Sequence, residues 1–129
     1  MPDAATTTLH LSLPPDPRLL RVLRLVASGV ASLAEFDLAT VEEVRVAVDE
    51  LGATLIGAST GETIDVTFEL SDNRLCVEGR TPLVHGVELE VDPLTDRILD
   101  VVATTHQWRS TDGFAHGRIE KDGVSAEVT

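Results

Sequence analysis

Glu50 and Thr54 are the residues of this sequence best placed to do chemistry. They lie in the stretch RVAVDELGAT, residues 45–54, which begins with the apolar spacing of an amphipathic helix. Residues four apart on a helix share one face, so the Glu50 carboxylate and the Thr54 hydroxyl are expected to be neighbours. A carboxylate in this setting is either a catalytic base or the solvated edge of an ordinary helix.

Other common chemistries have no support in the sequence. It contains no Gly-x-Ser-x-Gly motif, no Walker loop and no Cys-x-x-Cys pair. His85, His106 and His116 lack the local spacing of a metal site, so we predict no metal ligands among them. Cys76 is the single cysteine and lies in a strand-like run, where we expect a small buried hydrophobic side chain.

Length and charge restrict the class of protein. A chain of 129 residues corresponds to one domain, which we expect to span residues 1–129 with a loose tail at 122–129. The net charge of −12 argues against DNA or RNA as a partner, because their phosphates would be repelled. No apolar run reaches the ~18 residues of a membrane span, and the N-terminus lacks the pattern of a secretory signal. We therefore expect a cytoplasmic protein with no membrane partner.

The apolar periodicity predicts a series of strands and helices that do not strictly alternate. The predicted elements are a strand over 6–14, a helix opened by Pro17, a helix begun by a Thr40–Glu43 capping box, a hairpin of strands 62–70 and 73–80, a helix over 92–105, and a hairpin of strands 105–110 and 114–121. Residues 82–92 fit neither pattern. This order predicts an α+β fold, in which three helices cover one face of a largely antiparallel sheet.

Four segments resemble the anti-sigma-factor serine kinases of bacterial partner-switching systems, members of the histidine-kinase-like (GHKL) ATPase superfamily. In chain order they are LSLPPDPRLLRVLR, VEEVRVAVDELGATLI, IDVTFELSDNRLCVEGR and DPLTDRILDVVATTHQWRSTDGFAHGRIEK. The second is similar to the family's N-box helix, and together the four cover nearly the whole chain. The resemblance implies a GHKL or Bergerat-like α/β sandwich, whose sheet is mixed but mainly antiparallel.

The resemblance also implies roles for three residues. Glu50 stands where the family has its general base. Thr54 stands where the family has an asparagine that binds Mg²⁺, although a hydroxyl is a poorer oxygen donor for this ion than an amide carbonyl. Thr81 falls near the place of an aspartate that hydrogen-bonds the adenine amino group. Thr54 and Thr81 would therefore be the cofactor-binding residues if ATP and Mg²⁺ bind.

The motifs that surround these residues depart from the family pattern. No paired glycines follow Thr81, and the acidic run VELEVD, residues 87–92, stands where the family's glycines offer backbone N–H groups to phosphates. Carboxylates at this place oppose phosphate binding. We therefore expect no cofactor, with ATP and Mg²⁺ as ligands only if the site is functional.

Two functions follow from the resemblance. The favoured one is an anti-sigma-factor-like regulatory protein that binds its partner through its first helix or a sheet edge, with nucleotide binding weakened or lost. The alternative is an active ATP-dependent serine/threonine protein kinase that phosphorylates an anti-anti-sigma partner. A sigma factor or an anti-anti-sigma protein is the expected partner, and a homodimer is the expected assembly. A third hypothesis is an unrelated α+β domain.

Overall fold

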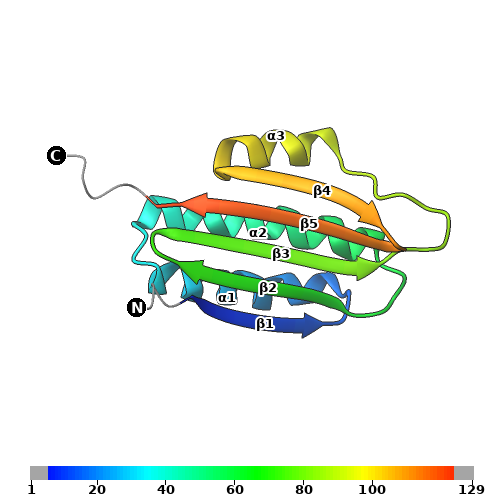
Figure 1. Ribbon diagram of the computed structural model, residues 1–129, viewed down its shortest axis with the longest axis horizontal. Helices are drawn as coiled ribbons and strands as arrows, with labels where there is room; N and C mark the ends of the chain where they lie inside the picture. Colours follow the sequence, from blue (N-terminus) through cyan, green and yellow to red (C-terminus); the bar gives the residue numbers. More distant parts are fainter. Residues whose placement is uncertain (1–5, 124–129) are drawn as a thin grey trace.

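Five strands and three α-helices form two layers in the computed structural model, which describes residues 6–123 (Figure 1). The strands are β1 (Thr7–Leu13), β2 (Ile64–Ser71), β3 (Arg74–Pro82), β4 (Thr105–Thr111) and β5 (Phe114–Asp122). The helices are α1 (Leu20–Leu33), α2 (Leu38–Ala58) and α3 (Pro93–Val102), with a 3₁₀ turn, η1 (Pro17–Leu19), before α1. This order confirms the predicted one. Most of the tail predicted to be loose, 124–129, lies outside the described residues, whereas Asp122 ends β5.

The sheet has the strand order β1-β2-β3-β5-β4, and every pairing in it is antiparallel. The expected mixed sheet is therefore wrong in this detail, although the α+β sandwich is confirmed. Helix α3 returns the chain so that β4 runs in the same direction as β3. The hairpin after β4 then places β5 between these two strands, so they never pair with each other.

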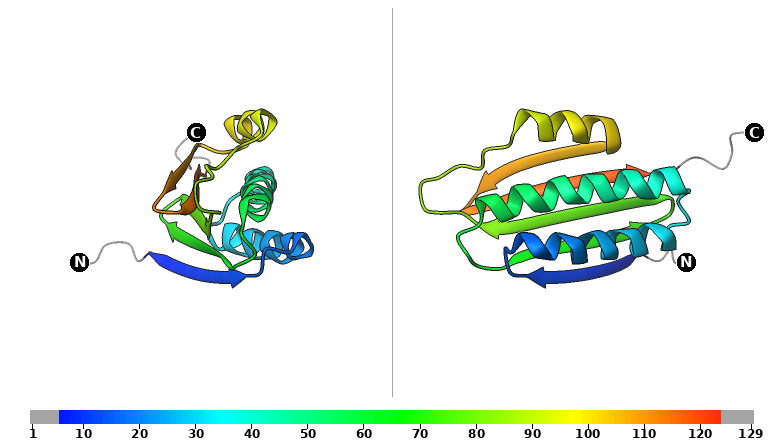
Figure 2. Two further views of the ribbon diagram at one scale, coloured as in Figure 1. Left: turned by 90° about the vertical axis from the view of Figure 1, so that its right-hand side faces the viewer. Right: turned by 180° about the vertical axis from the view of Figure 1, so that it is seen from behind.

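All three helices lie on one face of the sheet, and within residues 6–123 the opposite face carries no helix (Figure 2). Helix α2 lies in the centre, where it contacts α1, α3, β3 and β5. No helix within residues 6–123 is both long enough and apolar enough to cross a membrane.

Helix α2 begins earlier than its predicted capping box. The Asp37 carboxylate accepts a hydrogen bond from the backbone N–H of Thr40 at 2.8 Å, so Asp37 is the N-cap. The Thr40 side chain is buried, and Glu43 pairs with Lys121 at 2.8 Å. An aspartate three residues upstream therefore supplies the cap that the threonine was expected to supply.

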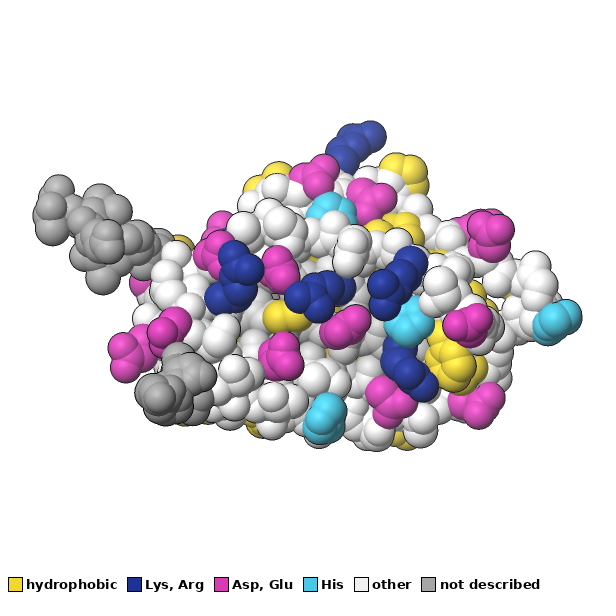
Figure 3. Space-filling view, in the orientation of Figure 1, with side chains coloured by type: hydrophobic (Ala, Val, Ile, Leu, Met, Phe, Trp, Pro, Cys, Tyr) yellow, Lys and Arg dark blue, Asp and Glu magenta, His cyan; other side chains and the backbone are white. Residues whose placement is uncertain are grey.

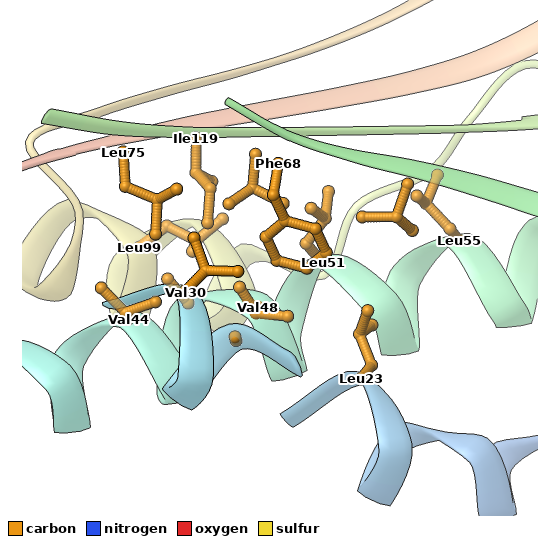
Figure 4. Close-up of a cluster of buried hydrophobic side chains, with 14 of the residues drawn as sticks. Leu23, Val30, Val44, Val48, Leu51, Leu55, Phe68, Leu75, Leu99 and Ile119 are labelled. Atoms are coloured by element: carbon orange, nitrogen blue, oxygen red, sulfur yellow. The ribbon is translucent and has the colours of Figure 1, made fainter. Parts of the chain in front are cut away.

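A pair of facing glycines lets α2 approach the two central strands. Gly79 of β3 and Gly117 of β5 are direct partners across the sheet. A Cβ atom on Gly79 would lie 2.5 Å from Leu55, and one on Gly117 would lie 2.5 Å from both Leu51 and Trp108. Figure 4 shows Leu51 and Leu55 pointing from α2 into the core beneath the strands. The glycines are therefore required for the depth at which these leucines pack.

Helix α3 is fastened to the edge strand β4 by one carboxylate. Asp96 accepts hydrogen bonds from Trp108 Nε1 at 3.0 Å and from His106 Nε2 at 3.3 Å. Leu99, which is fully buried, adds an apolar contact between α3 and the core. These contacts hold α3 in place against β4 and the core.

We predict that Gly117→Ala lowers the free energy of unfolding by about 1–3 kcal/mol, because the new methyl group would overlap Leu51 and the rigid ring of Trp108. Gly29→Ala is the matched control, since nothing lies within 4 Å of that helical position. Alanine there should stabilise the protein by up to about 1 kcal/mol. Urea denaturation followed by circular dichroism measures both changes, and equal stabilities for the two variants would contradict the packing described above.

Candidate functional site

A cavity of about 690 Å³ lies between the C-terminal half of α2, residues 83–92 and the start of α3. Its lining includes Ala53, Thr54, Gly57, Ala58 and Ser59 from α2 and the residue that ends it, Leu83, Val84, Val87, Glu88, Glu90 and Asp92 from the segment, and Thr95 from α3. The floor is mainly small and apolar, and the rim is acidic. This is the place where the resemblance to the kinase family puts a nucleotide.

Glu50 is joined to α3 by a hydrogen bond. The carboxylate is half-buried, and its Oε1 accepts a hydrogen bond from the Thr95 hydroxyl at 2.9 Å. Thr95 is only 9% exposed and lines the cavity, whereas Glu50 is not among the lining residues. One oxygen of the expected base therefore holds two helices together at the edge of the cavity.

Thr54 lies one turn further along α2 and lines the cavity directly. Its side chain is half-buried. The expected helical neighbours Glu50 and Thr54 thus lie along the same side of α2, next to Thr95. The Thr54 hydroxyl oxygen could bind a ligand in the cavity. Oε1 of the neighbouring Glu50, however, already accepts a hydrogen bond from Thr95.

Thr81 lies beneath the cavity rather than in its wall. The side chain is fully buried, and its hydroxyl lies 3.1 Å from Ser59 Oγ and 3.3 Å from the backbone oxygen of Thr63. Ser59 does line the cavity. The Thr81 hydroxyl therefore connects the end of α2 to the start of β2, and it reaches the cavity only through Ser59.

Among the described residues, the rim of the cavity carries three carboxylates and no lysine or arginine. Glu88 and Glu90 are exposed, and Asp92 caps α3 by accepting a hydrogen bond from the Leu94 N–H at 2.8 Å. Pro93 has no N–H to offer, so the first turn of α3 has one donor fewer. A phosphate would have to displace the Asp92 carboxylate and approach two further negative charges. The residues present do not fit the phosphates of ATP.

Residues 83–92 are held in place by a few backbone contacts. The Leu83 N–H bonds the Gly113 oxygen at 2.8 Å, and the Leu89 N–H bonds Ser110 Oγ at 3.1 Å. Both partners belong to the β4–β5 hairpin and its turn. This segment, which the sequence left unassigned, is thus an irregular connection fastened to that hairpin.

The remaining candidates take no part in the cavity. Within residues 6–123, no group of three or more His, Cys, Asp or Glu side chains could hold a metal ion. Cys76 is buried on β3, and burial is the main cause that raises the pKa of its thiol. The burial of Cys76 confirms what the sequence predicted for the cysteine.

Thr95 is the residue at the site that sequence reasoning missed. It lies on α3 four residues before the buried Leu99, so both point into the molecule. A threonine on the buried face of a predicted helix is a signal for a buried polar partner, because its hydroxyl must find an acceptor there. The identity of that acceptor, Glu50, depends on how α3 packs against α2.

The fold is similar to that of solved structures that include the RsbU and RsbW domains of Rv1364c from Mycobacterium tuberculosis. The TM-score is 0.73 at 11% sequence identity, and the match covers 91% of this chain and 32% of that chain. This chain therefore spans about a third of the length of that protein. No family model and no curated protein sequence matches the chain. The similarity shows that the two chains share this α+β fold.

We predict that the Glu50–Thr95 hydrogen bond contributes about 1 kcal/mol to the free energy of unfolding, because a half-buried carboxylate regains only part of its hydration when the bond is lost. Glu50→Ala, Thr95→Val and the double variant form a cycle in which the losses should not add. Thr95→Ser is the control, since it keeps the hydroxyl. Urea denaturation provides the measurement, and strictly additive losses would show that the bond contributes nothing.

Proposed function

We propose that the protein is an anti-sigma-factor-like regulatory module that acts by binding another protein, with nucleotide binding weakened or lost. The histidine-kinase-like fold supports this proposal, as does the sequence resemblance to the anti-sigma-factor serine kinases. The observation that carries it is the N-terminus of α3, where the Asp92 carboxylate accepts the Leu94 N–H that a phosphate would otherwise use. By resemblance, the partner is a sigma factor or an anti-anti-sigma protein, and the assembly is a homodimer.

An exposed apolar stripe on α1 supports protein binding. Val22, Leu25 and Leu33 are 42%, 68% and 66% exposed, and their spacing places them along the outer side of the helix. Leu23 and Val30 of α1 are buried in the core, whereas the three exposed residues lie outside the core cluster. Exposure of leucine side chains to water is unfavourable, and a contiguous apolar patch of this kind is typical of a protein-binding surface. The α1 stripe is therefore the proposed partner surface.

The alternative, an active ATP-dependent protein kinase, has one observation in its favour. Thr54 lines the cavity, and Glu50 lies one turn before it on α2. Against it stand the engaged Glu50 carboxylate and the acidic rim at Glu88, Glu90 and Asp92. A thermal-shift titration with nucleotide separates the two functions.

We predict that ATP, ADP and Mg²⁺ at millimolar concentration leave the melting temperature of the protein unchanged. A ligand at about 100 times its dissociation constant would add roughly 3 kcal/mol, or about 10 °C for a domain of this size. The measurement is a thermal-shift titration with Mg²⁺ alone as the blank and Glu50→Ala as the matched protein. A Mg²⁺-dependent rise that Glu50→Ala abolishes would favour the kinase instead.

We also predict that Leu25→Asp weakens binding to the cognate sigma factor or anti-anti-sigma protein by about tenfold or more, because it puts a charge into an apolar interface. The stability of the free protein should stay nearly constant, since Leu25 is exposed. Leu94→Asp on α3 is the control, because Leu94 is 59% exposed but lies away from α1. Calorimetry with candidate partners from the source organism measures both affinities. Equal affinities for the two variants would remove α1 from the interface.

A further inference from the structure

The uncovered face of the sheet gathers positive charge in a protein that is strongly acidic overall. Four of the ten Lys and Arg side chains lie on it, namely Arg74, Arg80, Arg109 and Arg118. Figure 3 shows dark blue side chains running across this face, with one cyan histidine among them. The opposite layer carries the helices, so no element among the described residues covers this face (Figure 2).

Two of these arginines are neutralised by carboxylates on the same face. Arg118 pairs with Glu120 at 2.8 Å and lies 3.7 Å from Glu78, and Arg74 pairs with Asp122 at 2.6 Å. The other two arginines, Arg80 and Arg109, lack such a partner among the described residues. Within the described part of the chain, neither Arg80 nor Arg109 has a carboxylate oxygen within 4.0 Å of its guanidinium nitrogens.

Arg80, His116 and Arg109 form one row across three adjacent strands, which we call the arginine row. In the sheet register, Arg80 of β3 and Arg109 of β4 are both direct partners of His116 on β5. Neighbouring strands lie about 4.8 Å apart, so the two arginines leave the sheet on either side of His116. All three side chains line a hollow of about 220 Å³ on this face.

The two arginines place positive charge around His116 that nearby carboxylates do not fully balance. Burial comes first, and the charges of Arg109 and Arg80 follow, in lowering the pKa of His116 below its usual value. Glu78 and Asp112 act in the opposite direction, but they do not reverse the shift. A negative group placed over the row would relieve this repulsion.

An aromatic ring borders the row. The Arg80 guanidinium lies over the ring of Phe114, 4.4 Å from its centroid, and this contact orients the arginine. Phe114 is half-buried, so part of its ring remains available for an apolar contact. Arginine beside an aromatic ring is a typical composition for the centre of a protein interface.

We propose that the arginine row is a docking site for an acidic segment of a partner protein, one carboxylate of which bridges Arg80 and Arg109 over His116. The inference rests on the proposed protein-binding function and specifies that one segment of the partner is acidic. The hollow admits one or two side chains, and Asp65 and Glu78 on its lining disfavour a long anionic strand such as nucleic acid. At physiological salt the net charge of the whole protein is screened beyond about 8 Å, so the local pairs decide the contact.

The test titrates the ¹⁵N-labelled chain with acetyl-Leu-Glu-Glu-Leu-amide at low ionic strength. We expect shifts that cluster at Arg80, Arg109, Phe114 and His116, together with a rise in the pKa of His116, because a bound carboxylate stabilises its charged form. The glutamine peptide, acetyl-Leu-Gln-Gln-Leu-amide, should cause neither. The double variant Arg80→Gln/Arg109→Gln should weaken the binding about fivefold or more.

Arg45→Gln/Arg97→Gln is the matched control, because it removes the same charge from the helical layer and should leave the binding unchanged. Equal weakening by both double variants, or equal shifts with the glutamine peptide, would overturn the proposal. Tighter binding of inorganic phosphate at the row would overturn it in favour of a small anion. A dimer that dissociates when the row is neutralised would overturn it in favour of a second copy. None of these outcomes depends on the nucleotide titration or on Leu25, so the two proposals fail separately.

Discussion

The close approach of α2 to the centre of the sheet is the constraint on which the other features depend. Leu51 and Leu55 occupy space that Gly79 and Gly117 leave empty on two paired strands. This packing fixes the depth and the rotation of α2 about its axis. Glu50 directly precedes Leu51. The packing of Leu51 against the sheet therefore also places Glu50 beside α3. The cavity is the space that remains between α2 and the irregular segment that leads to α3.

The cavity between α2 and α3 has an acidic rim, which is the opposite of the charge that phosphates require. A helix N-terminus offers free N–H groups to an anion, and here the anion is Asp92, which belongs to the helix itself. Glu50 bonds Thr95 and so stabilises the contact between two helices. Both interactions stabilise the folded state with groups that a nucleotide site would otherwise offer to its ligand, and they support the proposal of protein binding over catalysis.

Charge is distributed unevenly between the surfaces of the molecule. Carboxylates rim the cavity on the helical side, whereas the uncovered sheet face carries arginines that its own carboxylates neutralise only in part. Between them, the outer side of α1 is apolar. A partner that contacts both the α1 stripe and the arginine row would have to combine apolar residues with acidic ones. This combination gives the proposed interaction a specificity that net charge alone would not provide.

The sequence by itself determined the order of the elements, the helical neighbours Glu50 and Thr54, and the acidic run before α3. These features follow from local periodicity, from helical spacing and from residue type, which act over a few positions. Only the tertiary structure decided that β5 separates β3 from β4, that Thr95 engages Glu50, and that Arg80, His116 and Arg109 form one row. The residues in these contacts lie between 7 and 45 positions apart, and strand register and helix packing bring them together. No local pattern encodes that register, because it is set by how the whole core fills its volume.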